Sequence, residues 1–332
     1  MERLMQVITP DFVKGKRVIL RSDIDVLIEG GGLEEFRLEV GLPTLRMCLE
    51  YGSRVTMIGH LGRPDGQVTA NLSVEPVRRW FTNHGFSQDL TNGKLEILEN
   101  LRFDPRESFD STQDKDALEF AKELAAMGDV YINEAFSAYR PAVSTTILPT
   151  LLPHAAGLHF TKEVARLTTV RENPKRPFVA IIGGVKVEDK LPAIKVLSQI
   201  ADAVLVGGKI ASQITETSTI VEHNVMVGKL NEEGTDIAEE TTESWRSLIM
   251  RAKMIVWNGP LGKFEDPKNN QTSKVAQIVV ESEAESIIGG GDTISALNEA
   301  GLLDKFSLIS VGGGAMLKFL AEGTLPTIEA LK

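Results

Sequence analysis

The chain lacks several features that mark secreted, membrane-bound and nucleic-acid-binding proteins. Cys48 is the single cysteine among 332 residues, so an internal disulfide is excluded and a reducing compartment is favoured. No stretch reaches the roughly 20 apolar residues that a membrane span needs, and residues 1–10 contain no apolar run of signal-peptide type. The net charge of −10 argues against a general nucleic-acid partner. We therefore expect a cytoplasmic protein that binds neither membranes nor nucleic acids.

Aromatic residues are also scarce, at 6% of the chain, whereas glycine is frequent, with 29 residues. That balance is typical of α/β proteins, in which many tight turns join strands to helices. The 42% hydrophobic and 25% charged content is that of a globular protein. Because 332 residues exceed one ordinary hydrophobic core, we expect two domains.

Short runs rich in Val, Ile and Leu recur along the chain, with helix-like segments between most of them. The runs are 17–20, 54–58, 95–98 and 129–132 in the first half, and 178–182, 203–206, 254–257, 286–288 and 308–311 in the second. This alternation predicts parallel sheets covered on both faces. The expected fold class is α/β, with two doubly wound parallel-sheet (Rossmann-like) domains joined by a hinge helix.

Charged residues follow the strands predicted in the first half. The strand ends that contain them are Arg21, Asp23 and Asp25, then His60 to Pro64, then Glu99 to Arg102, and finally Asn133, Glu134 and Arg140. Ligands of parallel sheets bind just beyond the carboxyl ends of the strands. Arginines that converge there suit a small, multiply anionic ligand, because guanidinium groups pair bidentately with carboxylate and phosphate.

Glycines follow the strands predicted in the second half. They are Gly183-Gly184, Gly207-Gly208, Gly259, Gly289-Gly290-Gly291 and Gly312-Gly313-Gly314. Glycine lets the backbone approach a ligand closely, and helices that begin there direct N–H groups at phosphates. The pattern favours a nucleotide phosphate site, although neither G-x-x-x-x-G-K-[ST] nor G-x-G-x-x-G is present.

The contrast between the halves predicts a bilobal enzyme that holds its two substrates on separate walls of a cleft. A helix-like run that ends in two prolines, 162–177, is the expected boundary. We expect a substrate domain at 1–161, a hinge or linker helix at 162–177 and a nucleotide-binding domain at 178–318. The C-terminal segment, 319–332, is expected to return to the first domain.

In their order along the chain, these strand ends resemble those of the phosphoglycerate kinase family. The matching stretches are 16–26, Phe36-Arg37 with Leu42-Pro43-Thr44, His60-Leu61-Gly62-Arg63-Pro64, 99–103, 173–178, 183–190, 256–260 with Phe264-Glu265, 289–293 and 312–315. One such motif would be weak support, but seven or more in the family's order extend along nearly the whole chain.

The resemblance implies a phosphotransferase with a carboxyl group as acceptor. In glycolysis, such an enzyme moves a phosphoryl group reversibly between 1,3-bisphosphoglycerate and ADP, giving 3-phosphoglycerate and ATP. The resemblance also implies Mg²⁺, ATP or ADP as co-substrate, and a monomer. Phosphoryl transfer needs positioning and positive charge around the transferring group. No base or covalent nucleophile is needed because the attacking carboxylate is already ionised.

The same resemblance assigns roles to the candidate residues. The substrate would be bound by Asp23, Asp25, Arg37, His60, Leu61, Gly62, Arg63, Arg102 and Arg140. The catalytic residues would be Arg37, Lys186 and Lys190, which hold the transferring group and offset its charge. The nucleotide would be bound by Gly184, Lys190, Asn258, Glu265, Gly290, Gly291, Asp292, Thr293 and Gly313. Asp292 would hold Mg²⁺, and Glu265 would contact the ribose.

Several departures from the family pattern bear on this interpretation. Asp25 stands where the family has Asn, and its negative charge should weaken the binding of an anionic substrate unless a cation pairs with it. Leu27 replaces a nearby Pro. Tyr139 and Lys209 replace a His and a Gly. The stretch 212–235 is short, and 238–241 replaces a Gly-Pro-Lys-Thr-like run, so weaker or less selective nucleotide binding is expected.

Two alternatives to this kinase remain open. The first is a non-catalytic relative that binds a phosphorylated ligand or a partner through a trimmed nucleotide pocket. The second is a kinase for a different small acid. The presence of Arg37, Arg63, Arg102, Arg140, Lys186 and Lys190 favours activity.

Overall fold

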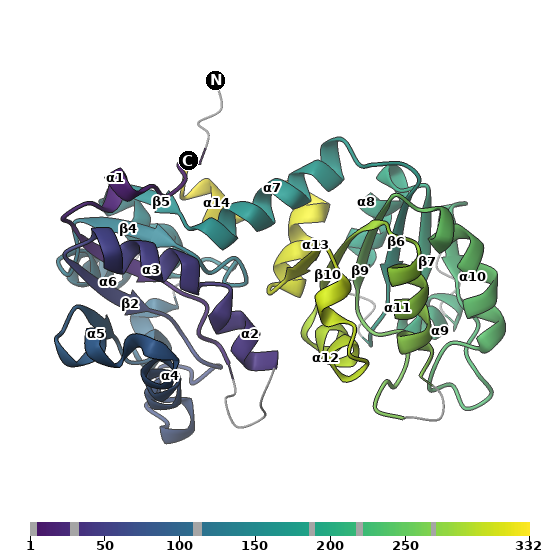
Figure 1. The fold of residues 1–332 in the computed structure, drawn as a ribbon, viewed down its shortest axis with the longest axis horizontal. Helices are drawn as coiled ribbons and strands as arrows, with labels where there is room; N and C mark the ends of the chain where they lie inside the picture. Colours follow the sequence, from purple (N-terminus) through teal and green to yellow (C-terminus); the bar gives the residue numbers. More distant parts are fainter. Residues whose placement is uncertain (1–4, 27–32, 109–114, 186–189, 217–221, 267–269) are drawn as a thin grey trace. The chain divides into compact units, whose positions relative to one another are not determined.

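Two separate parallel sheets organise the chain (Figure 1). The computed structural model describes residues 5–26, 33–108, 115–185, 190–216, 222–266 and 270–332. The chain divides into unit 1, Met1–Val164 with Thr324–Lys332, and unit 2, Ala165–Gly323. The predicted fold class is confirmed, since each unit is a parallel α/β layer structure.

The sheet of unit 1 has the strand order β3-β2-β1-β4-β5. Its strands are β1 (Arg17–Arg21), β2 (Arg54–Ile58), β3 (Leu95–Ile97), β4 (Val130–Asn133) and β5 (His154–Ala156). Every pair is parallel, and Arg21 is in register with Ile58 and Asn133. The residues that follow β1, β2 and β4 therefore emerge at one edge of the sheet.

Helices cover this sheet and bury their apolar faces against it. They are α1 (Pro10–Val13), α2 (Leu33–Glu39), α3 (Leu42–Tyr51), α4 (Glu75–Phe81), α5 (Ser87–Thr91), α6 (Lys115–Ala125), α14 (Pro326–Glu329) and the first part of α7 (Leu158–Glu172). Short turns of helix are η2 (Ala70–Leu72), η3 (Thr82–Phe86), η4 (Leu101–Phe103), η5 (Pro105–Glu107), η6 (Val143–Ile147) and η7 (Leu148–Leu151). On α3, Leu45, Cys48 and Leu49 enter the core. Burial raises the pKa of Cys48 to about 12, so this thiol is a packing group.

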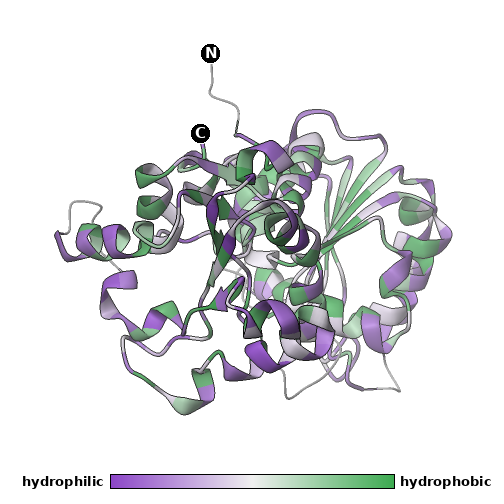
Figure 2. Ribbon diagram, turned by 60° about the vertical axis from the view of Figure 1, so that its left-hand side comes forward, coloured by the Kyte–Doolittle hydropathy of each residue, from purple (hydrophilic) through white to green (hydrophobic). Residues whose placement is uncertain are grey.

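The sheet of unit 2 has the strand order β11-β10-β9-β6-β7-β8, again all parallel. Its strands are β6 (Phe178–Ile182), β7 (Ala203–Val206), β8 (Val225–Val227), β9 (Met254–Asn258), β10 (Glu285–Gly289) and β11 (Leu308–Ser310). Its helices are the rest of α7, α8 (Leu191–Ile200), α9 (Gly208–Glu216), α10 (Glu239–Arg251), α11 (Gln271–Glu281), α12 (Gly291–Glu299), η8 (Leu303–Lys305) and α13 (Gly313–Glu322). Every residue of β6 and β9 is buried, and Figure 2 shows the strands in hydrophobic colours. Such strands are those of a sheet covered on both faces.

The chain passes from unit 1 to unit 2 within α7, between Val164 and Ala165. It returns to unit 1 at Thr324, where α14 packs against η6. Leu325, Ile328 and Leu331 of this segment are buried. Among the described residues, no helix combines the length and the apolar character that crossing a membrane requires.

Candidate active site

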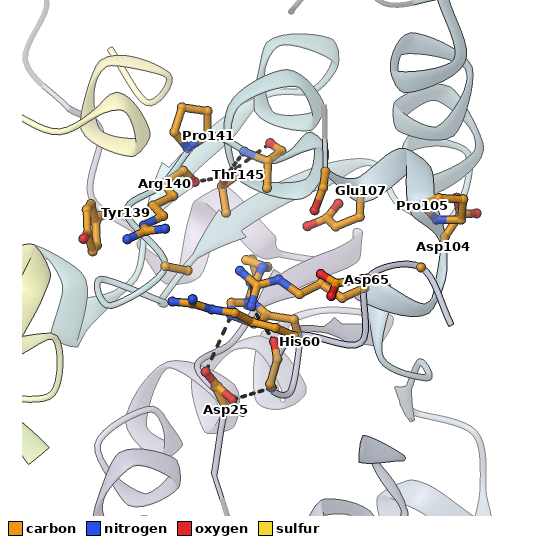
Figure 3. A pocket seen from close by; sticks show the side chains of 18 of the residues that line it. Asp25, His60, Asp65, Asp104, Pro105, Glu107, Tyr139, Arg140, Pro141 and Thr145 are labelled. Carbon is orange, nitrogen blue, oxygen red and sulfur yellow. Dashed lines mark hydrogen bonds and ion pairs between the residues drawn. The ribbon is translucent and has the colours of Figure 1, made fainter. Parts of the chain in front are cut away.

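A cavity of about 680 Å³ lies at the carboxyl edge of the unit 1 sheet (Figure 3). Six of the predicted substrate residues line it, namely Asp25, His60, Gly62, Arg63, Arg102 and Arg140. Arg21 lines it as well, so four arginines face one space. Asp65, Asp104 and Glu107 supply further acidic groups. The wall is thus charged, with cations positioned to bind an anion.

The loop that follows β2 is fixed by Asn100. The Asn100 side chain accepts from Leu61 N at 3.1 Å and donates to Leu61 O at 2.8 Å. The Leu61 side chain is buried, so this residue anchors the loop in the core. Gly62 has φ 56°, a conformation that favours glycine, and its carbonyl accepts from Arg102 Nη1 at 2.6 Å. Arg102 is thereby held at the rim of the same loop.

His60 is enclosed by arginine side chains. Its Nδ1 lies 2.5 Å from Arg21 Nη2. Burial and the charges of Arg21, Arg102 and Arg37 hold the pKa of His60 well below its usual value. The imidazole is therefore neutral at neutral pH, so His60 adds a hydrogen-bonding group to the basic cluster and no positive charge.

The Asp25 carboxylate is held by backbone and by His60. Its Oδ1 accepts from Gly62 N at 2.7 Å, and its Oδ2 lies 3.8 Å from His60 Nε2. Burial lowers the pKa of Arg102, and the charge of Asp25 opposes that shift. The charge of Asp25 thus acts on Arg102. About two fifths of the Asp25 side chain remains exposed, and this residue lines the cavity.

Asp23 and Arg37 lie beside this cavity. Asp23 is buried, and its Oδ2 accepts from Ser137 Oγ at 2.5 Å. Arg37, on the last turn of α2, places Nε 3.7 Å from Asp23 Oδ2 and donates from Nη1 to Asp25 O at 2.7 Å. The two residues are thus brought together, as expected if they serve one ligand.

Arg63 and Arg140 are the most exposed of the cavity arginines. Within the described part of the chain, neither forms an ion pair, and Arg140 lies over the Tyr139 ring at 6.0 Å. Exposed guanidinium groups at the mouth of a cavity are available to a carboxylate or phosphate.

In unit 2, glycines bring the carboxyl ends of the central strands close together. Gly183 N donates to Asn258 O at 2.9 Å, and Gly184 N donates to Pro260 O at 2.8 Å. A Cβ on Gly259 would lie 2.1 Å from Gly183 O, and a Cβ on Gly313 would lie 2.4 Å from Gly290 Cα. Side chains are excluded at these points, which leaves a surface of bare backbone.

Lys190 reaches this surface from the start of α8. Its Nζ donates to Asn258 Oδ1 at 2.6 Å and lies 3.3 Å from Asn258 O. Asn258 Nδ2 in turn donates to Gly313 O at 3.2 Å. Five predicted nucleotide residues therefore lie together, namely Gly184, Lys190, Asn258, Gly290 and Gly313. The predicted catalytic Lys186, like Leu27, lies outside the described residues.

The helix α12 begins beside this group. Gly290 precedes it with φ 102°, and the N–H groups of Gly291, Asp292 and Thr293 have no acceptor within the helix. Thr293 is fully buried, and its hydroxyl accepts from Gly259 N at 2.7 Å, so the side chain ties the start of α12 to the residue that follows β9. The Asp292 carboxylate is exposed in the first turn. Such a helix start suits a phosphate.

A short hairpin packs against the loop that carries the exposed Glu265. Leu230 and Ile237 pair antiparallel, and Thr235 O accepts from Lys263 N at 2.8 Å. The buried Asp236 carboxylate accepts from Gln271 N at 2.8 Å, and burial raises its pKa to about 6. The short stretch after α9 thus ends in an ordered turn tied to the Glu265 loop.

The residues that position the substrate cavity were only partly predicted. Arg21 is predicted only as one of the charged residues at the end of the first strand. Its guanidinium donates to Ser22 O and Ser144 Oγ and contacts His60. The signal was a charged residue that ends a buried central strand. Asn100 and Ser137 carried no such signal, because their partners lie far away in sequence.

The chain is an α/β protein with two parallel-sheet units. One unit carries an arginine-lined cavity, and the other carries a lysine on a glycine surface, so both suit anions. The family model for phosphoglycerate kinase matches residues 9–228 and 213–323. The chain belongs to the phosphoglycerate kinase family.

Curated relatives and solved structures agree with this membership. The chain is 35% identical to the phosphoglycerate kinase of Rubrobacter xylanophilus over 383 residues and 33% identical to that of Leptospira biflexa over 386, with 96% of each chain covered. These alignments are longer than the 332 residues of this chain, so the relatives contain segments that it lacks. The structure of the Coxiella burnetii phosphoglycerate kinase superposes with a TM-score of 0.80 at 29% identity, covering 96% of both chains. That of the Pyrococcus horikoshii enzyme gives 0.83 at 25% identity, covering 98% of both.

Proposed function

We propose that this chain catalyses the reversible transfer of a phosphoryl group between 1,3-bisphosphoglycerate and ADP, giving 3-phosphoglycerate and ATP in glycolysis. The observation that carries the proposal is the arginine-lined cavity of unit 1, in a chain of this family. Its cations match a ligand that carries a phosphate and a carboxylate.

On the substrate side, each group has a distinct task. Arg63, Arg102 and Arg140 neutralise the phosphate and carboxylate of the triose. Asp23 accepts a hydrogen bond from the substrate hydroxyl, and Arg37 offsets charge on the transferring group. His60 donates a neutral N–H. The attacking oxygen belongs to an ionised carboxylate, so the protein needs no general base.

On the nucleotide side, Lys190 leaves Asn258 to hold the transferring phosphoryl, together with Lys186. The bare backbone at Gly184 and Gly313 and the N–H groups at the start of α12 receive the nucleotide phosphates. Glu265 accepts from the ribose. Loss of one such cation costs on the order of 10³-fold in rate.

Asp292 is the residue we propose for Mg²⁺. Mg²⁺ at nucleotide sites is held by one or two carboxylates together with substrate phosphates, and an exposed carboxylate beside phosphate-binding N–H groups fits that chemistry. When bound, the ion would offset phosphate charge. Among the described residues, no three His, Cys, Asp or Glu side chains cluster as a metal site of their own.

A coupled assay with 3-phosphoglycerate, ATP and Mg²⁺ tests the function. We expect turnover that Lys190→Ala reduces by about 10³-fold, because a cation at the transferring group is lost. Lys195→Ala, an exposed lysine on the same helix, is the control and should leave the rate unchanged. Absence of turnover in the parent protein, with 3-phosphoglycerate still bound, would contradict the proposal.

That outcome would favour the second candidate, a non-catalytic phospho-ligand or partner-binding relative. Its support is Asp25 in the cavity and the short 212–235 stretch, of which 217–221 lies outside the described residues. Calorimetry with ATP and GTP compares the two, since tight ATP-selective binding would argue against a trimmed nucleotide pocket. We further propose a cytoplasmic monomer, in keeping with the single buried cysteine.

A further inference from the structure

A buried chain of hydrogen bonds runs behind His60. Glu107 Oε1 accepts from Ser144 Oγ at 2.6 Å, and Glu107 Oε2 accepts from Ser144 N at 3.0 Å. Ser144 Oγ accepts from Arg21 Nε at 3.1 Å, and Arg21 Nη2 lies 2.5 Å from His60 Nδ1. The chain joins η5, η6, the end of β1 and the loop after β2, so four segments fix one imidazole.

The two charged members of this chain are almost fully buried. Arg21 and Glu107 each expose 1% of their surface. Burial raises the pKa of Glu107, while the charge of Arg21 and the bonds from Ser144 oppose that shift. A buried cation is costly unless its donors are satisfied, and here Ser22 O takes another Arg21 donor at 2.6 Å. The fully buried Tyr131 donates to Ser144 O at 2.8 Å and so holds Ser144 from behind.

The contact with Arg21 determines where the imidazole proton lies. A guanidinium group only donates and stays protonated. His60 Nδ1 must therefore accept, and the proton of the neutral ring is on Nε2. Nε2 is the atom that lies 3.8 Å from Asp25 Oδ2. In the view of Figure 3, Glu107 and Asp25 lie on opposite sides of His60. The N–H donor therefore points away from the buried chain.

We propose that Arg21, held in place by Ser144 and Glu107, is a positioning residue that fixes His60 as its Nε2–H tautomer. The cavity then offers its ligand a neutral donor of set direction among guanidinium groups. A free imidazole would divide its population between two tautomers and two ring orientations, and ligand binding would have to select one of them. The inference rests on the proposed function only for the identity of that ligand, 3-phosphoglycerate.

Nitrogen-15 NMR of the imidazole groups tests the proposal in the parent protein. The chain has five histidines, so the His60 signals are assigned by their loss in His60→Gln. We expect one acceptor-type and one protonated nitrogen, unchanged from pH 5.5 to 8, with the proton on Nε2. A proton on Nδ1, or titration near pH 6.5, would overturn the proposal. This readout needs no turnover, so it stands or falls separately from the kinase assay.

Two variants test the buried chain itself. Ser144→Ala removes the link between Glu107 and Arg21, and Glu107→Gln keeps an acceptor but removes the charge. We expect mixed tautomers in Ser144→Ala and a roughly five- to tenfold higher KM for 3-phosphoglycerate, with the KM for ATP unchanged. Glu107→Gln should give a smaller change of the same kind. The control is Thr146→Ala. The Thr146 hydroxyl donates to Ala142 O and takes no part in the buried chain. A Ser144→Ala protein with a single Nε2–H tautomer and parent KM values would refute the role of this chain.

Discussion

At the scale of residues, the substrate cavity depends on how each charge is balanced by a neighbour. Sequence reasoning placed the arginines correctly at the edge of the first sheet, because charged residues that end parallel strands must emerge together. It could not show that His60 is neutral. The lowered pKa of His60 comes first from burial and then from the charge of Arg21, whose Nη2 lies 2.5 Å away, and both depend on segments distant in the chain.

Replacement of Asp25 by Asn should strengthen substrate binding. The amide oxygen can still accept from Gly62 N, while one negative charge in the cavity is removed. We expect the KM for 3-phosphoglycerate to fall roughly three- to tenfold at low ionic strength, and less at high salt. Asp65→Asn is the control, since Asp65 also lines the cavity and Asn tolerates its φ of 51°. An equal effect of both variants would mean that net charge matters and position does not. A KM for Asp25→Asn that stays unchanged or rises would contradict the expectation.

At the scale of elements, the nine apolar runs of the sequence are all strands in the structure. The apolar runs identified neither β5 nor β8. β5 consists of His154, Ala155 and Ala156 and so contains no Val, Ile or Leu. β8, Val225–Val227, is apolar and could have been identified. No pattern in the sequence indicates how α7 begins, because its capping side chains, Thr44 of α3 and Glu134 directly after β4, are distant in the chain.

The start of α7 is capped by Thr44 and Glu134. Thr44 Oγ1 accepts from Leu158 N at 2.9 Å. Glu134 accepts from His159 N at 3.0 Å and from Phe160 N at 3.1 Å. Three otherwise unpaired N–H groups of the helix are thus satisfied by side chains of unit 1. Burial raises the pKa of Glu134 to about 7, against 4.5 ordinarily.

This raised pKa predicts a pH-dependent contribution to stability. The folded protein keeps the Glu134 proton to higher pH than the unfolded chain, so the contribution is full below about pH 4.5 and is lost as the pH rises to about 7. We expect the stability advantage of the parent over Glu134→Gln to shrink by about 2–3 kcal/mol between pH 5 and 8, measured by urea unfolding. The control is Glu99→Gln. Glu99 also accepts hydrogen bonds from backbone N–H groups, but its carboxylate is exposed. If the stability advantage of the parent over Glu134→Gln stays constant or grows with pH, the raised pKa of Glu134 is refuted.

At the scale of the whole molecule, the sequence indicated two halves because arginines end the strands of one and glycines those of the other. Each half could be recognised from its own residues. The passage between units inside α7 could not be located to the residue, since the amphipathic pattern of that helix runs through it without interruption.

We predict that the two units approach each other when both ligands are bound. The substrate cavity and the glycine surface belong to different units, so in-line transfer requires the two units to bring their ligands together. Small-angle scattering should show a smaller radius of gyration with 3-phosphoglycerate and a non-hydrolysable ATP analogue together than with either alone. Identical profiles without ligand, with either ligand alone and with both ligands would rule out such closure.

Unit 1 is assembled from two stretches of sequence, 1–164 and 324–332, and the whole of unit 2 lies between them. A ribosome therefore completes unit 2 before it makes the segment that seals unit 1 through Leu325, Ile328 and Leu331. The usual order, in which the N-terminal domain finishes first during synthesis, is reversed here. A nascent chain that stalls near residue 323 would carry all of unit 2 and a unit 1 without the apolar segment that contains Leu325, Ile328 and Leu331, so the groups that pack on this segment would be exposed.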